Sequence, residues 1–343
     1  MAGPLSGTAT RRPAAGPEAK PPRPARAVPA GARRLGGLLA LLARRALLLA
    51  VLLAAVFAAV ELLPGDAANA TSERGESAAD LARRRELLGL DRPVAGRFAD
   101  WMTGLPSGDL GTSARGESVA DLLSRPFPNT LLLGGLALLV TLAVSVALGC
   151  WAALKPGGGV DRAVSATATG VLALPEFVVA VALVLVFALW TGWLPAVTLT
   201  DADGSPASWQ MLVLPVLALA IPQIGWNTRI VRAALADEAK APHVETAVID
   251  GLPRHRVFTH HLLPGALPTI AAGIATSTGM LLGGAVVVET IFNYPGIGSV
   301  LAGAVTDRDS PVIAGVVAVT GAVITGVLLL ADLVRARASG GRT

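Results

Sequence analysis

An all-α polytopic membrane protein with six transmembrane helices is the fold class that this sequence predicts. Hydrophobic residues make up 53% of its 343 residues and charged residues only 15%, whereas a soluble domain carries about 25% charged residues. The mean hydropathy is +0.61. Aromatic residues contribute only 4%, so the apolar mass comes from Ala, Leu, Val and Ile, as in membrane helices. These observations exclude an ordinary soluble enzyme, a disordered protein and a coiled coil.

Each predicted span rests on length, because a helix needs about 20 predominantly apolar residues to cross a membrane. Six stretches meet this requirement. The fourth is the weakest, since it is short and holds Pro215 and Pro222. Those prolines predict kinks or a helix buried among other helices. The six predicted spans are residues 46–63, 130–154, 163–189, 211–228, 266–288 and 311–334.

The segments outside the spans complete the predicted organisation. The first 34 residues are rich in Pro, Ala, Gly and Arg and predict a disordered basic tail. A cleaved signal peptide is not expected, because the apolar stretch begins too late. The tail over 1–34 is followed by an amphipathic lead-in and first span over 35–63 and by a long connection over 64–129, in which a helix is predicted near 77–88. A membrane domain over 130–335, which includes the connection 229–265, and a tail over 336–343 complete the predicted division.

The distribution of Lys and Arg predicts the orientation of the chain. These residues are concentrated in the N-terminal tail, in the connection 229–265 and after the last span, whereas the short third connection holds none and the fifth only Arg308. Short cytoplasmic loops are enriched in Lys and Arg. Both termini and the connection 229–265 are therefore predicted to be cytoplasmic, and the net charge of +4 is ascribed to this sidedness rather than to nucleic-acid binding.

Catalytic patterns are absent from the sequence. No lysine follows a glycine and precedes Ser or Thr, so there is no Walker A phosphate loop. There is also no His-Glu-x-x-His motif and no Gly-x-Ser-x-Gly elbow. Gly296 and Gly298 follow Tyr294 and Pro295 rather than a strand, which argues against a dinucleotide site. A single cysteine, Cys150, excludes an intrachain disulfide framework.

All four histidines lie in the connection 229–265. A metal site is one interpretation, because imidazole is a common metal ligand. No cysteine or suitably spaced acid completes a set of ligands, so a polar cytoplasmic surface is favoured and no metal is expected. The four residues are His243, His255, His260 and His261.

Three acidic residues lie in or near the predicted spans. A carboxylate within the bilayer is costly and usually faces the bundle interior or a pathway. Glu61 and Glu289 lie at the outer ends of their spans, where a solvated helix end is an equally good interpretation. Glu176 follows Pro175 in mid-span, and it is the candidate for a group that lines a pathway.

The connection 229–265 carries the motif that points to a family. Glu245-Thr-Ala-Val-Ile-Asp-Gly251 is followed by nine residues and then by His261-Leu-Leu263-Pro264. This resembles the EAA loop of the membrane subunits of ABC importers, in which Glu-Ala-Ala is followed by three residues, Gly, nine residues and Ile-x-Leu-Pro. His261 departs from the pattern at the Ile position. The matching residues are Glu245, Thr246, Ala247, Gly251, Leu263 and Pro264.

In that family the loop forms a short cytoplasmic helix that docks in a cleft of a separate ATPase subunit. The residues here suit this role. Val244, Ala247 and Val248 fall at i, i+3 and i+4 and predict an apolar docking face. Gly251 predicts a left-handed turn that ends the helix, and Pro253 prevents its continuation.

Further segments in the same order resemble the first permease subunit of dipeptide/oligopeptide/nickel-type importers. The resemblance covers about residues 44–334 and implies a type I ABC importer permease fold. One departure concerns charge, because members usually carry basic residues in the loop where this chain has Glu245 and Asp250. The supporting segments are residues 62–66, 86–93, 108–113, 193–195, 284–298 and 308–311.

The resemblance implies a non-catalytic subunit of the plasma (inner) membrane. Its expected partners are a second homologous permease, two ABC ATPase domains that bind ATP and Mg, an extracytoplasmic substrate-binding protein that docks on the connection 64–129, and membrane lipid. No cofactor in this chain and no nucleic acid are expected. The substrate stays open among dipeptides, longer peptides, nickel chelates and other small solutes.

Two other classes of function receive less support. A secondary transporter or channel acting alone needs ion-coupling groups or a self-sufficient pore, and the spans offer few such groups and no inverted repeat. An integral-membrane enzyme needs a catalytic cluster, which the sequence lacks.

Overall fold

The computed structural model describes residues 30–62, 65–72 and 76–340. These residues form helices joined by loops, with two isolated β-bridges and no longer strand among them. Most of the predicted tail over 1–34 lies outside the described residues, and helix α1 (Ala30–Glu61) begins ahead of the predicted boundary. The chain divides into two units, Met1–Ala46 and Leu47–Thr343. The first contributes the start of α1, and the helices treated below belong to the second.

Five predicted spans are matched by helices long and apolar enough to cross a membrane. The third predicted span differs, because it consists of α7 (Gly159–Leu172) and of α8 (Glu176–Leu183) continued by η2 (Val184–Trp190), bent by 99°. Pro175 disfavours a helical conformation in the residue before it, which accounts for the break. The matching helices are Leu39–Glu61, Val119–Ala153, Gln210–Glu238, Arg254–Ile291 and Ser310–Val334.

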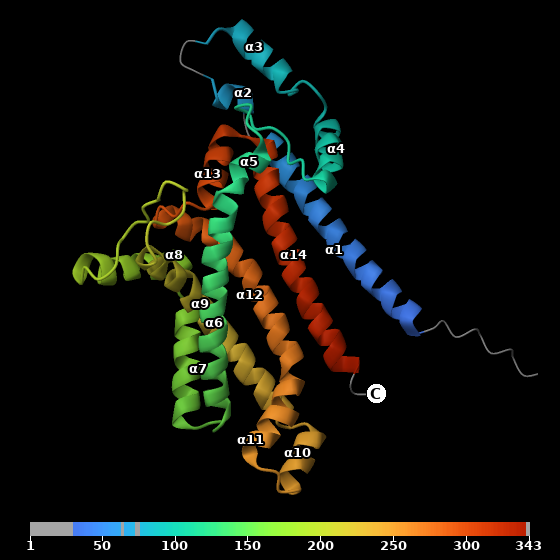
Figure 1. Cartoon of the computed structure of the whole chain (residues 1–343), viewed down its shortest axis with the longest axis vertical. Coiled ribbons are helices and arrows are strands. Elements are labelled where there is room, and N and C mark those ends of the chain that lie inside the picture. Colours follow the sequence, from blue (N-terminus) through green and yellow to red (C-terminus); the bar gives the residue numbers. More distant parts are fainter. Residues whose placement is uncertain (1–29, 63–64, 73–75, 341–343) are drawn as a thin grey trace, which may run out of the picture. The chain divides into compact units, whose positions relative to one another are not determined.

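Helix α9 (Gln210–Glu238) is the central helix of the second unit. Helices α6 (Pro126–Ala153), α7, α8 and α12 (Leu263–Ile291) all pack against it (Figure 1). The prediction that this proline-containing span is buried among other helices is confirmed, since Pro215 and Pro222 are both buried within it. Glycines allow close approach of the helices: a Cβ on Gly225 would lie 2.7 Å from the Ala168 carbonyl oxygen of α7.

Where the structure describes the connection predicted over 64–129, it folds as four short helices and one 3₁₀ turn before α6 begins. The helix predicted near residues 77–88 is confirmed, and Ser77 caps it by accepting a hydrogen bond from the Asp80 N–H at 3.2 Å. Beside this connection, α14 (Ser310–Gly340) packs on α12, on α13 (Ile297–Asp307) and on α5. The elements of the connection are α2 (Ala67–Ala70), α3 (Ala78–Leu87), α4 (Val94–Gly104), η1 (Leu105–Ser107) and α5 (Val119–Ser124).

The connection 229–265 is helical on both flanks, as predicted. Helix α9 extends beyond the predicted span to Glu238, and α10 (Pro242–Ile249) follows it. After the break, α11 (Arg254–Arg256) and the π-helical segment η3 (Val257–Leu262) lead into α12. Figure 1 shows α10 and α11 at the ends of α9 and α12.

Candidate functional site

The predicted coupling loop is built from a short helix, a left-handed turn and the start of a long helix. Helix α10 begins at Pro242, whose missing N–H and restricted φ suit a first helical turn. Beyond Ile249, Gly251 adopts φ +75°, the conformation that commonly ends helices. The Leu252 N–H donates to the Ala247 carbonyl at 3.2 Å. The predicted left-handed turn at Gly251 is thereby confirmed.

The structure corrects the predicted apolar docking face of α10. Val244 and Ala247 are each 4% exposed, and they pack inside the loop in one cluster with Val257. Of the predicted face, Val248 is exposed, at 60%, and its neighbour Ile249, which was not part of the prediction, is 76% exposed. Val244 and Ala247 therefore stabilise the loop by packing inside it. The exposed apolar surface of α10 consists of Val248 and Ile249, which lie beside this buried stripe.

The residues that match the family motif occupy two elements around the turn at Gly251. Glu245 and Thr246 lie exposed on α10, whereas Ala247 is buried beneath them. Leu263 and Pro264 begin α12, directly after the π-helical segment. Because Pro264 lacks an N–H, a regular helical hydrogen bond is lost there, which accounts for a wider turn just before it. Of these motif residues, Ala247 is thus buried and Leu263 is half-buried, whereas the others are exposed.

The histidines contribute contacts within the loop. His243 Nε2 lies 3.4 Å from Glu238 Oε1 at the end of α9, and the rings of His243 and His261 are 6.4 Å apart. Among the described residues, no group of three or more His, Cys, Asp or Glu is placed to hold a metal ion. The histidine contacts therefore tie α10 to the helices on either side of it.

An ion pair between α7 and α9 was not predicted from the sequence. Asp161 of α7 is 3% exposed and accepts two hydrogen bonds from Arg232 of α9, the one from Nη2 at 2.7 Å. Asp161 Oδ2 also accepts from the Gly157 N–H at 2.7 Å. No local signal points to this pair, because its members are 71 residues apart. The pair joins α7 to the part of α9 that leads into the coupling loop.

Glu176 is the first residue of α8, directly after the bend. Its carboxylate lies against Gly284 of α12, where no side chain stands in the way. The carboxylate also lies beside the side chain of Gln223 in α9. The mid-span acid singled out by the sequence is thus partly buried between two helices of the bundle.

Glu289 is not a solvated helix end, because it is 1% exposed. Its carboxylate accepts hydrogen bonds from Thr130 Oγ1 and from the Gly298 N–H, both at 2.6 Å. Thr130 Oγ1 in turn accepts from the Ile297 N–H at 2.9 Å. Glu289 therefore joins the end of α12 to the starts of α6 and α13.

Tyr294 and Asn129 form a second layer of the same junction. The Tyr294 hydroxyl donates to the Asn129 carbonyl at 2.9 Å. The Asn129 side-chain amide donates to the carbonyls of Pro295 at 2.8 Å and of Gly204 at 2.9 Å. Burial, assisted by the Glu289 carboxylate, raises the pKa of Tyr294 above its usual range. The segment 284–298 therefore has a structural role that its spacing alone did not reveal.

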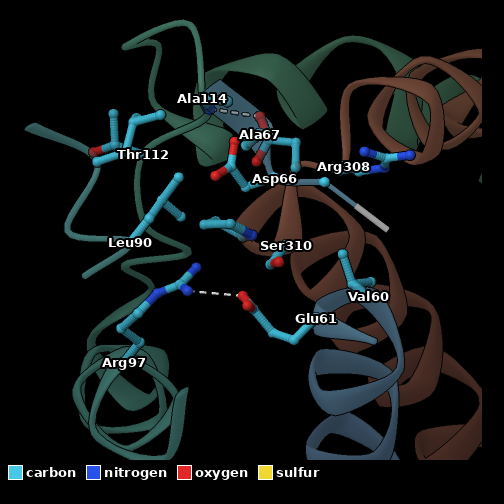
Figure 2. Close-up of a pocket in the computed structure, with 14 residues that line it drawn as sticks. Val60, Glu61, Asp66, Ala67, Leu90, Arg97, Thr112, Ala114, Arg308 and Ser310 are labelled. Carbon is cyan, nitrogen blue, oxygen red and sulfur yellow. Dashed lines mark hydrogen bonds and ion pairs between the residues drawn. The ribbon is translucent and has the colours of Figure 1, made fainter. Parts of the chain in front are cut away.

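The connection 64–129 borders a polar cavity of about 250 Å³ beside the end of α1 (Figure 2). Glu61 reaches toward Arg97 of α4, with Oε1 2.7 Å from Nη1. The Ala114 N–H donates to Asp309 Oδ2 at 2.6 Å. Glu61 is therefore an ion-paired residue and not an isolated solvated helix end.

Comparison with known proteins places the chain in a family. Residues 145–339 match the family described as binding-protein-dependent transport system inner membrane component. A probable peptide ABC transporter permease protein of Sinorhizobium fredii is 32% identical over 81% of this chain and 90% of its own length. The glutathione transport system permease protein of Pectobacterium atrosepticum is 33% identical over 77% of this chain and 85% of its own.

A solved structure with a similar backbone is an inward-facing form of the MetNI methionine ABC transporter. Its TM-score is 0.48 and its sequence identity 17%, with coverage of 65% of this chain and 96% of that chain.

The matches define a class of protein: a membrane-embedded, non-catalytic subunit of an ABC transporter, whose ATPase is a separate subunit. This chain belongs to the family of binding-protein-dependent transport system inner membrane components. It is a permease of the inner membrane that works with an ATPase and a substrate-binding protein.

Proposed function

We propose that this chain is a permease subunit of an ATP-driven importer for peptides or related small solutes. The observation that carries the proposal is the similarity over 81% of the chain to a protein named as a probable peptide permease. The name of the Pectobacterium atrosepticum relative, a glutathione permease, supports the same class of solute.

The proposed assembly contains a second homologous permease, two ABC ATPase domains and an extracytoplasmic binding protein, surrounded by membrane lipid. ATP and Mg bind to the ATPase domains, so this chain needs no cofactor, and nucleic acid is not a partner. The concentration of Lys and Arg supports a cytoplasmic location for both termini and for α10. The opposite end of the spans, with the connection 64–129, then receives the binding protein.

Coupling to the ATPase proceeds through the exposed edge of α10. Val248 and Ile249 provide an apolar tip that suits a groove in the ATPase. Glu245 and Asp250 flank this tip with negative charge, so complementary basic side chains are expected on the ATPase.

The remaining motif residues transmit the movement of α10 into the bundle. Ala247 anchors α10 on the inner side of the loop, and Gly251 supplies the turn between the two helices. Thr246 lies beside the exposed tip, and Leu263 and Pro264 begin α12. ATP binding elsewhere then shifts the population between outward-open and inward-open states. Glu176 lines the pathway between the two permeases.

The first test is to tag the chain in its native membrane, extract it gently and identify the proteins that co-purify. An ATPase with a Walker A motif and a second six-span permease support the assembly. Reconstituted with the binding protein, the complex should accumulate trialanine only with ATP. Movement of trialanine by this chain alone, without ATP, would establish a stand-alone carrier instead.

Two matched pairs of variants test the coupling role. Gly251→Pro should abolish ATP-dependent uptake, because proline cannot adopt positive φ, whereas Gly251→Asn tolerates that conformation and should retain most uptake. Glu245→Arg should reduce uptake by more than Glu245→Gln, since it reverses the charge at the docking edge. Full uptake in both Gly251→Pro and Glu245→Arg, with the complex still assembled, would contradict this role.

A further inference from the structure

The carboxylate of Glu176 has no counter-ion among the described residues. Two other acids within or beside the spans have basic partners: Asp161 pairs with Arg232, and Glu61 pairs with Arg97. Among the described residues, the polar side chain beside the Glu176 carboxylate is the neutral amide of Gln223. A carboxylate inside a membrane protein is normally paired or faces a water-filled cavity. The missing positive charge is therefore expected from outside the described part of the chain.

Gln223 supplies the second observation. Its side chain is buried, with the residue 4% exposed, and it lies beside the Glu176 carboxylate. Its Oε1 atom has no hydrogen-bond partner, although buried polar atoms in proteins are nearly always satisfied. The Glu176 carboxylate thus supplies a negative charge, and Gln223 Oε1 supplies a hydrogen-bond acceptor. Neither group has a positively charged donor among the described residues.

The surroundings keep this pair in place and open on one side. Gly284 of α12 has no side chain, so the Glu176 carboxylate lies directly against its backbone. On the other side, Leu174 is 46% exposed and Phe177 is 53% exposed. A carboxylate that faced lipid between these apolar residues would be costly, so the open side suits a pathway shared with the second permease.

We propose that Glu176 and Gln223 form a site that binds an ammonium group of the transported solute. An ammonium carries one positive charge and three donors, which match the carboxylate and the free Gln223 Oε1. The ammonium comes from the α-amino group of a peptide or from a lysine side chain. The inference rests on the proposed function.

The test uses the complete co-purified transporter in lipid nanodiscs, without nucleotide or binding protein. Saturation-transfer NMR titrations measure the affinity of three probes: trialanine with a free α-ammonium, Nα-acetyltrialanine without one, and Nα-acetyl-lysine amide with a side-chain ammonium. The variants are Glu176→Gln and Glu176→Asp. The matched control is Glu117→Gln, which removes an exposed carboxylate of the connection 64–129.

At least one ammonium probe should bind the wild-type complex at least tenfold more tightly than Nα-acetyltrialanine. Glu176→Gln should lose this difference, whereas Glu176→Asp and Glu117→Gln should retain most of it. If Glu176→Gln weakens the binding of trialanine alone, the site binds the α-ammonium. If it weakens the binding of Nα-acetyl-lysine amide alone, the site binds the side-chain ammonium. Equal binding of all three probes to the wild-type complex overturns the proposal, even if no variant can be purified.

The proposed function is tested separately, by ATP-dependent uptake of trialanine with the binding protein present. Uptake by the wild-type complex together with equal binding of the three probes rejects only the ammonium site. Absence of ATP-dependent uptake rejects the proposed function, whatever the titrations show.

Discussion

Asp161 and Arg232 form an ion pair between α7 and α9, in which the Nε and Nη2 groups of the guanidinium each donate to one oxygen of the buried carboxylate. Arg232 lies in the stretch of α9 that continues into the coupling loop. The pair therefore fixes the orientation of that stretch relative to α7. Removal of one partner leaves the other charge without its counter-charge, which destabilises proteins strongly.

Replacement of Arg232 by Met should lower the unfolding temperature of the purified complex by several degrees. Asp161→Asn should have a smaller effect, because an amide retains one acceptor for the Gly157 N–H. Differential scanning fluorimetry measures both. Lys240→Met is the control, since the pair of Lys240 with Asp237 is exposed and such pairs contribute little. Equal shifts for Arg232→Met and Lys240→Met would refute a special role for the buried pair.

Ile249→Asp should weaken binding of the ATPase without unfolding the loop. Ile249 is 76% exposed in this chain, and loss of a central apolar anchor costs about 2 kcal/mol or more of binding. Val244→Asp places the same charge in the buried cluster of the loop and should disrupt the loop itself. Titration of purified ATPase against the permease pair, with limited proteolysis of the loop, separates the two effects. Unchanged ATPase affinity in Ile249→Asp would show that this edge does not dock.

Asp309 should make the protein more stable as the pH falls. Burial raises its pKa above the ordinary value of 3.8, although the backbone N–H groups of Ala114 and Val312 donate to it. As the pH falls through this raised value, the folded state takes up a proton that the unfolded state does not bind. Stability therefore increases, and the gain is complete only below the unfolded pKa.

The pH effect is measured as the difference in unfolding temperature between wild type and Asp309→Asn as the pH is lowered from about 7.5 to about 4.5, a range that lies above the ordinary pKa of Asp. The wild type should gain on the variant as the pH falls. Asp100→Asn serves as the control, because the ion pair of Asp100 with Arg92 is exposed. A difference that shrinks with falling pH would contradict the assignment.

Two glycines of α13 should respond oppositely to the same substitution. A Cβ on Gly298 would lie 2.9 Å from the Cα of Val286 and 2.6 Å from Glu289 Oε2, whereas one on Gly303 meets nothing within 4 Å. Gly298→Ala should destabilise by about 1–3 kcal/mol through overpacking. Gly303→Ala should be neutral or stabilise by about 0.5–1 kcal/mol, as in a helix interior. Thermal unfolding of the two variants decides the matter, and equal effects would contradict the close packing at Gly298.

The sequence by itself determined the features that depend on composition and local conformation. Apolar length defined five spans, but the break of the third span at Pro175 was not predicted, since kinks were expected in the fourth span. The positive φ of Gly251 followed from its place after an amphipathic stretch. These features arise within one helix or turn, so neighbouring residues are sufficient to specify them.

Only the tertiary structure decided which side of each helix is covered. The apolar residues of α10 divide into buried Val244 and exposed Ile249 because η3 packs against one side of the helix. Glu289 is buried because Thr130, 159 residues away, lies beside it. Glu176 meets Gln223 for the same reason. Such contacts join helices distant in the chain, and their partners depend on how those helices pack.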